Sequence, residues 1–219
     1  MEISRVTRTK EEAGETYNKL SKWYDLLAGY WERKPRDIGL RMLGVKEGEK
    51  VLEIGFGTGR AIISLAESVG NSGRVYGIDI SSGMHEVAGS AIMKADLSER
   101  VEFICGDAIE LSFETNFFDA IFMSFTLELF DTPEIPIVLQ ECNRVLKKNG
   151  RICVVAMSKR GKAGLMMKIY EWAHEKFPKY IDCRPIFVEE ALKNAGCKII
   201  SIKKMSLWRL PVEIVLAKM

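Results

Sequence analysis

Short apolar segments alternate with amphipathic segments through the middle of the chain, and this rhythm constrains the fold more than any other feature. Strand-length apolar segments separated by helical segments of about 10–15 residues are typical of βαβ units and a parallel sheet. The expected strands are residues 50–54, 74–80, 101–105, 117–124 and 151–157. The expected helices between them are residues 60–69, 82–97 and 133–146.

The expected strands are nearly all apolar, which indicates that helices cover both faces of the sheet. Beyond them, residues 161–177 predict one longer helix and residues 186–194 a shorter one. Two last apolar segments, 197–207 and 212–217, are separated by Pro211 and are expected to pair antiparallel at the sheet edge. The sequence therefore predicts an α/β fold with a doubly wound, seven-stranded, mostly parallel sheet whose last strand is antiparallel.

The chain of 219 residues is expected to form a single domain, because no linker, repeat or low-complexity tract divides it. Its expected parts are an N-terminal helical cap at 1–45, a core at 50–157, an insert at 158–185, and a C-terminal helix with edge strands at 186–219. Large apolar residues of the cap recur at helical spacing and predict one helical face formed by Tyr17, Leu20, Tyr24, Leu27 and Trp31. A second helix is expected to start at Pro35 and to end at Gly44.

The charge of the chain is nearly balanced, with 32 lysine and arginine residues against 30 aspartate and glutamate residues. Proteins dedicated to nucleic acids carry a strong basic excess, so no nucleic-acid partner is expected. No apolar segment has the roughly 18–20 residues of a membrane span, and the N-terminus lacks a secretory signal, so a cytoplasmic protein is expected. The five cysteines contain no C-x-x-C spacing, and no metal site is expected.

The strongest motif is E-I-G-F-G-T-G at 53–59, which follows an expected strand and precedes an expected helix. A nucleotide-binding loop requires this context, and its glycines allow a tight turn and a close backbone approach to a ligand. The dinucleotide fingerprint G-x-G-x-x-G fits poorly, because its third glycine would fall on Arg60 and a glutamate stands two positions before the first glycine. The chain contains no G-x-x-x-x-G-K-[ST] sequence, so a P-loop is excluded.

The pattern E-x-G-x-G-x-G resembles the first motif of the class I S-adenosylmethionine (SAM) methyltransferases, whose fold is Rossmann-like. Further similar motifs follow in order: Asp79 ends the second expected strand, CGDAIEL follows the third, SFTLE follows the fourth, and RVLKKNGRI precedes the fifth. Within that superfamily the chain is most similar to the ubiquinone/menaquinone C-methyltransferase group. The similarity is carried by the GTG at 57–59, the SSGM after Asp79, and the pairs Asp107-Ala108, Ser124-Phe125 and Tyr24-Asp25.

The resemblance implies SAM as the cofactor and S-adenosylhomocysteine as its product. In that family the glycine loop passes the methionine end of the cofactor, and the acid at the position of Glu53 helps to hold its amino group. The acid at Asp79 holds the ribose diol, Asp107 and the backbone of Ala108 bind adenine, and Met84 packs on it. The residues expected to bind the cofactor are Tyr24, Glu53, Gly55, Phe56, Gly57, Thr58, Gly59, Asp79, Ile80, Met84, Asp107, Ala108 and Ser124.

The resemblance also implies in-line methyl transfer to a small, apolar or aromatic acceptor, with quinol-like C- or O-methylation favoured. Such acceptors usually need a proton removed, and the candidate bases are His174, Tyr24, Glu128 and Asp131. The quinone enzymes carry D-S-Y-x-Y-L-x-E-S before the final helix, where this chain reads KYIDCRPIFVEEAL. The aromatic, lysine-flanked segment 161–177 is a lid over an apolar substrate, a peripheral membrane contact, or a helix packed on its own domain.

Three other functions stay open from the sequence alone. One is a protein that kept the fold for binding without catalysis. Another is an RNA or protein methyltransferase, although the balanced charge and the lack of an Asn/Asp-Pro-Pro-aromatic motif after the fourth expected strand weigh against methylation of bases. The last is an NAD-type oxidoreductase, for which the third glycine is missing. No feature of the sequence indicates an oligomeric state.

Overall fold

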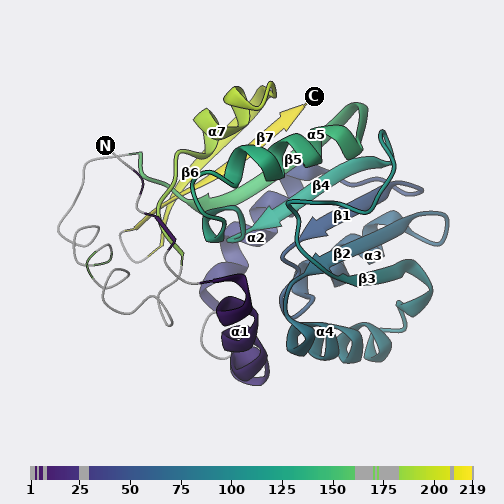
Figure 1. The fold of residues 1–219 in the computed structure, drawn as a ribbon. Coiled ribbons are helices and arrows are strands. Elements are labelled where there is room, and N and C mark those ends of the chain that lie inside the picture. The colour runs from purple at the N-terminus through teal and green to yellow at the C-terminus, as the bar shows by residue number, and fades with distance from the viewer. Residues whose placement is uncertain are drawn as a thin grey trace.

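A computed structural model describes residues 3, 5–6, 9–24, 30–160, 170, 172, 183–207 and 210–218. Within these residues the chain forms a seven-stranded sheet ordered β3-β2-β1-β4-β5-β7-β6 (Figure 1). The strands are β1 Lys50–Ile54, β2 Arg74–Asp79, β3 Val101–Cys105, β4 Phe118–Ser124, β5 Leu146–Met157, β6 Lys198–Leu207 and β7 Leu210–Lys218. The first five strands are parallel to one another, whereas β7 runs antiparallel to β5 and β6. The predicted fold class is confirmed.

Helices cover both faces of this sheet (Figure 1). They are α1 Lys10–Tyr24, α2 Tyr30–Leu43, α3 Arg60–Val69, α4 Ser82–Lys94, α5 Ile135–Val145 and α7 Val188–Asn194, with short 3-10 turns η2 Ser98–Arg100 and η3 Leu127–Leu129. Helices α5 and α7 pack on one face, and α2, α3 and α4 on the other. Successive side chains of a strand point to opposite faces, so Leu52 and Ile54 of β1 join the first core layer and Val51 joins the second.

Three elements, β1, α3 and β3, begin and end at the predicted residues. Helix α3 buries one continuous stripe made of Ala61, Ile62, Leu65, Ala66 and Val69. Gly59 and Gly70 flank this helix with positive φ angles of 80° and 63°, a conformation that favours glycine. These elements could be predicted because the apolar period and the flanking glycines indicate the same boundaries.

The N-terminal cap departs from the prediction in two places. Helix α2 begins at Tyr30, so Pro35 lies inside this helix and does not start it. Trp31 therefore belongs to α2 and does not continue the helical face of Tyr17. A proline inside a helix removes one backbone hydrogen bond, but packing of α2 on the sheet through residues such as Ile38 offsets this cost.

The C-terminal half departs from the prediction at two strand boundaries. Residues 147–150, which precede the expected strand at 151–157, belong to an irregular start of β5. Leu146 is buried and pairs with Phe118, and the register of β4 with β5 shifts before the next pair. Pro211 does not separate the last two strands, because it is the second residue of β7 and lies opposite Ser206 of β6. A proline near the start of a strand costs little, since only one ladder donor is lost.

The predicted helix at 161–177 lies outside the described residues, except for Tyr170 and Trp172. The Tyr170 hydroxyl donates a hydrogen bond to the carbonyl oxygen of Cys183 over 2.8 Å, and Trp172 is exposed. No helix in the described part of the chain is both long enough and apolar enough to cross a membrane.

Gly39 lets α2 approach the sheet closely, which gives the first testable prediction. A Cβ atom at this position would lie 2.6 Å from Cγ2 of Val155 and 3.0 Å from Cε2 of Phe122, both fully buried. We expect Gly39→Ala to lower the free energy of unfolding by about 1–3 kcal/mol, because a packed core resists added volume. Urea denaturation measures this loss.

Gly89 of α4 provides the matched control. A Cβ atom there would meet no other atom within 4 Å, and the residue has no positive φ. Gly89→Ala should leave the free energy of unfolding unchanged or raise it by up to about 1 kcal/mol, because alanine favours helices. Equal effects of the two substitutions would contradict the close approach of α2.

Candidate functional site

The carboxyl ends of β1, β2, β3 and β4 meet at one edge of the sheet, where ligands bind in parallel α/β folds. A cavity of about 520 Å³ lies there, which is within the range of about 300–1,000 Å³ for small-molecule sites. Of the residues predicted to bind a cofactor, the structure brings together around this cavity Glu53, Gly55, Phe56, Gly57, Thr58, Asp79, Ile80, Met84, Asp107, Ala108 and Ser124. Gly59 is not part of the lining, and the side chain of Tyr24 is outside the described residues.

The glycine loop between β1 and α3 has left-handed backbone at Gly55 and Gly57, with φ angles of 72° and 50°. A Cβ atom on Gly55 would collide with the side chain of Thr126, so this glycine lets the loop lie against the segment after β4. A Cβ atom on Gly57 would meet nothing within 4 Å, so this position faces open space. The ring of Phe56 is buried against Phe103, with centroids 4.6 Å apart, and thereby anchors the loop.

Asp79 is held by backbone donors at the end of β2. The N–H groups of Gly57 and Ser81 donate to its two carboxylate oxygens over 3.0 Å and 2.9 Å. Burial raises the pKa of Asp79, although the hydrogen bonds from Ser81 and Gly57 act against that shift. Each oxygen keeps a further lone pair, so the anchored carboxylate can still accept hydrogen bonds from a ligand.

Glu53 is buried at the end of β1 with only 3% of its surface exposed. Its Oε2 atom has no hydrogen-bond partner in the described part of the chain. Burial raises the pKa of Glu53 well above its ordinary value, the nearby guanidinium of Arg36 opposes this shift, and Asp79 adds to it. A buried acid that lacks a partner on a cavity wall is a feature that a ligand donor can satisfy.

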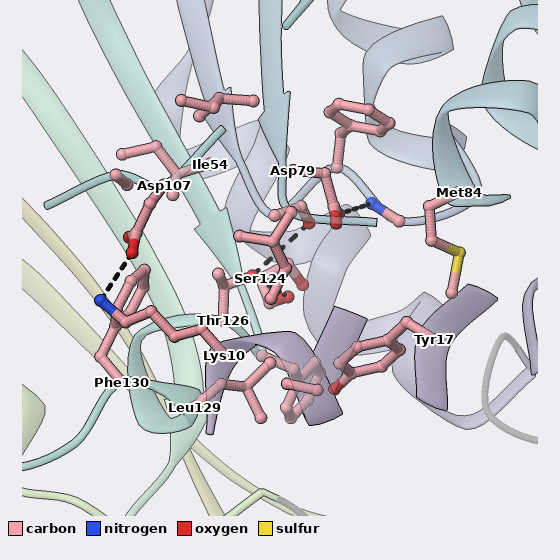
Figure 2. Close-up of a pocket in the computed structure, with 18 of the residues that line it drawn as sticks. Lys10, Tyr17, Ile54, Asp79, Met84, Asp107, Ser124, Thr126, Leu129 and Phe130 are labelled. Carbon is pink, nitrogen blue, oxygen red and sulfur yellow. Dashed lines mark hydrogen bonds and ion pairs between the residues drawn. The ribbon is translucent and has the colours of Figure 1, made fainter. Parts of the chain in front are cut away.

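Lys10 is a cavity residue that the sequence reasoning missed. Its Nζ atom lies 2.6 Å from Oδ2 of Asp107 (Figure 2) and also 2.6 Å from Oε1 of Glu134. The other oxygen of Asp107 accepts a hydrogen bond from the N–H of Ile109 over 3.1 Å. Lys10 therefore joins the start of α1 to the loop after β3 and to the residue before α5.

Helix α1 is fixed at the cavity by hydrogen bonds at its start and in its middle. Thr9 and Glu12 form a reciprocal capping box, with N–H to side-chain distances of 2.9 Å and 3.2 Å. The Oδ1 atom of Asn18 accepts a hydrogen bond from the Ser81 hydroxyl over 2.7 Å. This docking places Tyr17 at the cavity (Figure 2). The T-x-x-E signature of the capping box is the signal that marks this helix start in the sequence.

The candidate bases Asp131 and Glu128 act as anchors in this arrangement. Asp131 accepts hydrogen bonds from Nη2 of Arg5 over 2.6 Å and from the N–H of Val6 over 3.0 Å. The hydrogen bond from Arg5 holds the pKa of Asp131 well below its usual range. Glu128 is fully buried, accepts a hydrogen bond from the N–H of Met157 over 3.0 Å and does not line the cavity.

The other two candidate bases, His174 and the side chain of Tyr24, lie outside the described residues. The general base therefore stays a prediction.

Arg184 fixes the segment that follows η3. Its side chain is fully buried, and it donates hydrogen bonds to Oγ1 of Thr132 over 3.0 Å and to the carbonyl oxygen of Phe130. Burial lowers the pKa of Arg184, whereas the nearby Asp131 and Glu128 oppose that shift. Because Phe130 and Asp131 line the cavity, this arginine positions part of the cavity wall from a distant part of the chain.

We expect Arg184→Ala to lower the free energy of unfolding by about 2–3 kcal/mol, because buried acceptors then lose a charged donor. Urea denaturation measures the loss, and Thr132→Val tests its origin. The two substitutions should be coupled by about 0.5–3 kcal/mol, since they remove the same hydrogen bond. Arg74→Ala, at an exposed position of β2, should change the stability by no more than about 0.5 kcal/mol. Strictly additive losses would contradict the role given to Arg184.

Comparison with known proteins adds independent similarities. Residues 51–150 match the family described as a methyltransferase domain. The chain is 33% identical to the demethylmenaquinone methyltransferase of Lactococcus lactis, over 91% of this chain and 87% of the relative. The structure of a SAM-dependent methyltransferase from Aquifex aeolicus is similar with a TM-score of 0.68 and 25% identity, over 92% of this chain and 97% of that one.

A further solved structure is similar over nearly its whole length. The [4+2]-cyclase SpnF gives a TM-score of 0.79 at 21% identity, over 99% of this chain and 97% of that one. A likeness at this identity shows the fold alone, and one fold supports several kinds of chemistry.

Proposed function

The chain belongs to the class I SAM-dependent methyltransferases of small molecules, and from that premise we propose that its acceptor is apolar or aromatic, with quinol-like C- or O-methylation favoured. The observation that carries this proposal is the group of apolar side chains, Tyr17, Leu129 and Phe130, on the cavity wall away from the strand ends. The Lactococcus lactis relative, named for a demethylated menaquinone, supports the same acceptor class.

The cavity has features that fit SAM. The open space at Gly57 suits a ligand chain that lies over the loop. The spare lone pairs of Asp79 suit a ribose diol, and Asp107 with the backbone of Ala108 suits an adenine amino group. The unpartnered Oε2 atom of Glu53 suits an ammonium group. When bound, SAM supplies an electrophilic methyl group on a sulfonium centre.

The chain contributes orientation to such a transfer. Two backbone N–H donors fix the carboxylate of Asp79 before any ligand arrives, so it needs little reorganisation on binding. Lys10, with its ion pairs, and Arg5, with its hydrogen bonds to Asp131, hold the N-terminal residues at the cavity. Holding two reactants in line at short range supplies a large part of the rate, and no covalent intermediate with the protein is needed.

The wall away from the strand ends carries apolar side chains beside the ion-paired Lys10. Figure 2 shows Tyr17, Leu129 and Phe130 on the side of the cavity opposite Ile54 and Asp79. A flat aromatic acceptor buries well against aromatic and aliphatic side chains, because aromatic rings contribute a large apolar contact area.

Gly57 provides the test of the cofactor site. We expect Gly57→Ala to weaken the binding of S-adenosylhomocysteine by about tenfold or more, because the added methyl group fills the space that the ligand requires. Isothermal titration calorimetry measures the affinity, and denaturation measures the accompanying loss of stability.

Gly196, next to the C-terminus of α7, is the matched control. It has a φ of +88° and open space around its Cβ position, but it is not among the cavity residues. Gly196→Ala should therefore bring a similar strain of about 1–2 kcal/mol without any loss of affinity. Normal binding by Gly57→Ala would remove the glycine loop from the cofactor site.

Leu129 provides the test of the acceptor class. With a quinol acceptor found by screening quinols, phenols and small amines, Leu129→Ala should lower kcat/KM by about tenfold, because buried apolar contact with the acceptor is lost. The affinity for S-adenosylhomocysteine should change by less than about threefold. Ile137→Ala, at an exposed position of α5, is the control and should leave both quantities unchanged. A screen in which only amines are methylated would overturn the proposed acceptor class.

A further inference from the structure

Two side chains of opposite charge reach the cavity with polar atoms that lack partners. Glu53 comes from β1, and its Oε2 atom is buried without a hydrogen bond. Arg36 comes from α2, and its Nε atom is likewise buried without a hydrogen bond within the described part of the chain. Among the described residues, the guanidinium donates a hydrogen bond from Nη2 to Oδ1 of Asp37 over 3.1 Å.

These two groups lie close enough to influence each other, since Arg36 lowers the pKa of Glu53, yet no direct hydrogen bond joins them among the described residues. A buried polar atom without a partner costs about 1–3 kcal/mol, and native proteins keep few of them. A cation and an anion on the wall of one cavity are together complementary to a ligand that carries both charges.

We propose that Arg36 binds the carboxylate of the amino-acid end of the cofactor, opposite Glu53, so that the cavity recognises this end as a zwitterion. The inference rests on the proposed cofactor site and adds a residue from the N-terminal cap. A guanidinium suits this task, because its fixed fork of N–H donors matches both oxygens of a carboxylate.

The packing of α2 holds Arg36 in place. Gly39 lies three residues later, on nearly the same face of the helix, and the close approach of α2 to Val155 and Phe122 sets the distance of that face from the sheet. Asp37 fixes one Nη atom and leaves the Nε edge for a ligand. Three other cations in the described part of the chain line the cavity. Lys10 and Arg5 form ion pairs with Asp107 and Asp131, and Arg60 is exposed, so water screens its charge.

The first test uses the unaltered protein and two ligands that differ by one group. SAM and decarboxylated SAM share the adenosine, the sulfonium and the amine, and only SAM has the carboxylate. We expect calorimetry to give an affinity for decarboxylated SAM that is weaker by about tenfold or more. Equal affinities would overturn the proposal without any variant, whereas a failure of both ligands to bind would overturn the proposed cofactor site itself.

The second test assigns the carboxylate to its partner. Arg36→Met should weaken the binding of SAM by about tenfold or more and the binding of decarboxylated SAM by less than about threefold. The affinity of Arg36→Lys for SAM should lie between that of Arg36→Met and that of the unaltered protein. Arg33→Met, on the exposed face of α2, is the matched control and should change neither affinity.

Two further outcomes would overturn the assignment to Arg36. One is a selective loss of SAM binding in Arg60→Met with normal binding in Arg36→Met. The other is an equal loss in Arg36→Met for SAM and for 5′-methylthioadenosine, which lacks the whole amino-acid end, because such a loss would mean a merely structural role.

Discussion

Two carboxylates, Glu53 and Asp79, are buried at the carboxyl ends of neighbouring parallel strands, and much of the structure around them compensates for this. Ile54 lies opposite Ile78 in the register of β1 with β2, so the two acids end at the same edge of the sheet. Burial raises the pKa of both. The left-handed glycine loop turns a backbone N–H towards Asp79, the residue that caps α4 supplies another, and α2 brings the charge of Arg36 near Glu53.

The raised pKa values of Glu53 and Asp79 indicate that a feature suited to ligand binding lowers the stability of the free protein. The stability contributed by a carboxyl with a raised folded pKa is fully present below its unfolded pKa and is lost as the pH rises through the folded value. Ionisation of Glu53 therefore costs the free protein stability. A ligand that supplies a positive charge and hydrogen-bond donors at this edge regains that free energy on binding. Such a trade is common at functional sites, where stability gives way to complementarity for a ligand.

The sequence predicts the sheet, most helix positions and the residues at the strand ends, because these follow from apolar periodicity and from the meeting of parallel strand ends at one edge. It does not predict the partners that arrive from far along the chain. Lys10 forms an ion pair with Asp107, and Arg184 donates a hydrogen bond to Thr132, and no local sequence pattern predicts either contact. The sequence also does not predict that Pro35 lies inside α2, since packing of α2 on the sheet outweighs the local preference of proline.

The residues that the sequence predicts and those that it does not predict lie on different walls of the cavity. The wall at the strand ends is built by residues within 50–157, where the family motifs lie and predict the lining residues. The opposite wall takes Tyr17 from α1 and a segment after β4 that Arg184 holds from beyond the core. A change in the accessory segments can therefore reshape the wall that we propose for the acceptor while leaving the strand-end wall in place. One fold can thus carry different chemistry, and the same fold is present in a methyltransferase and in a cyclase.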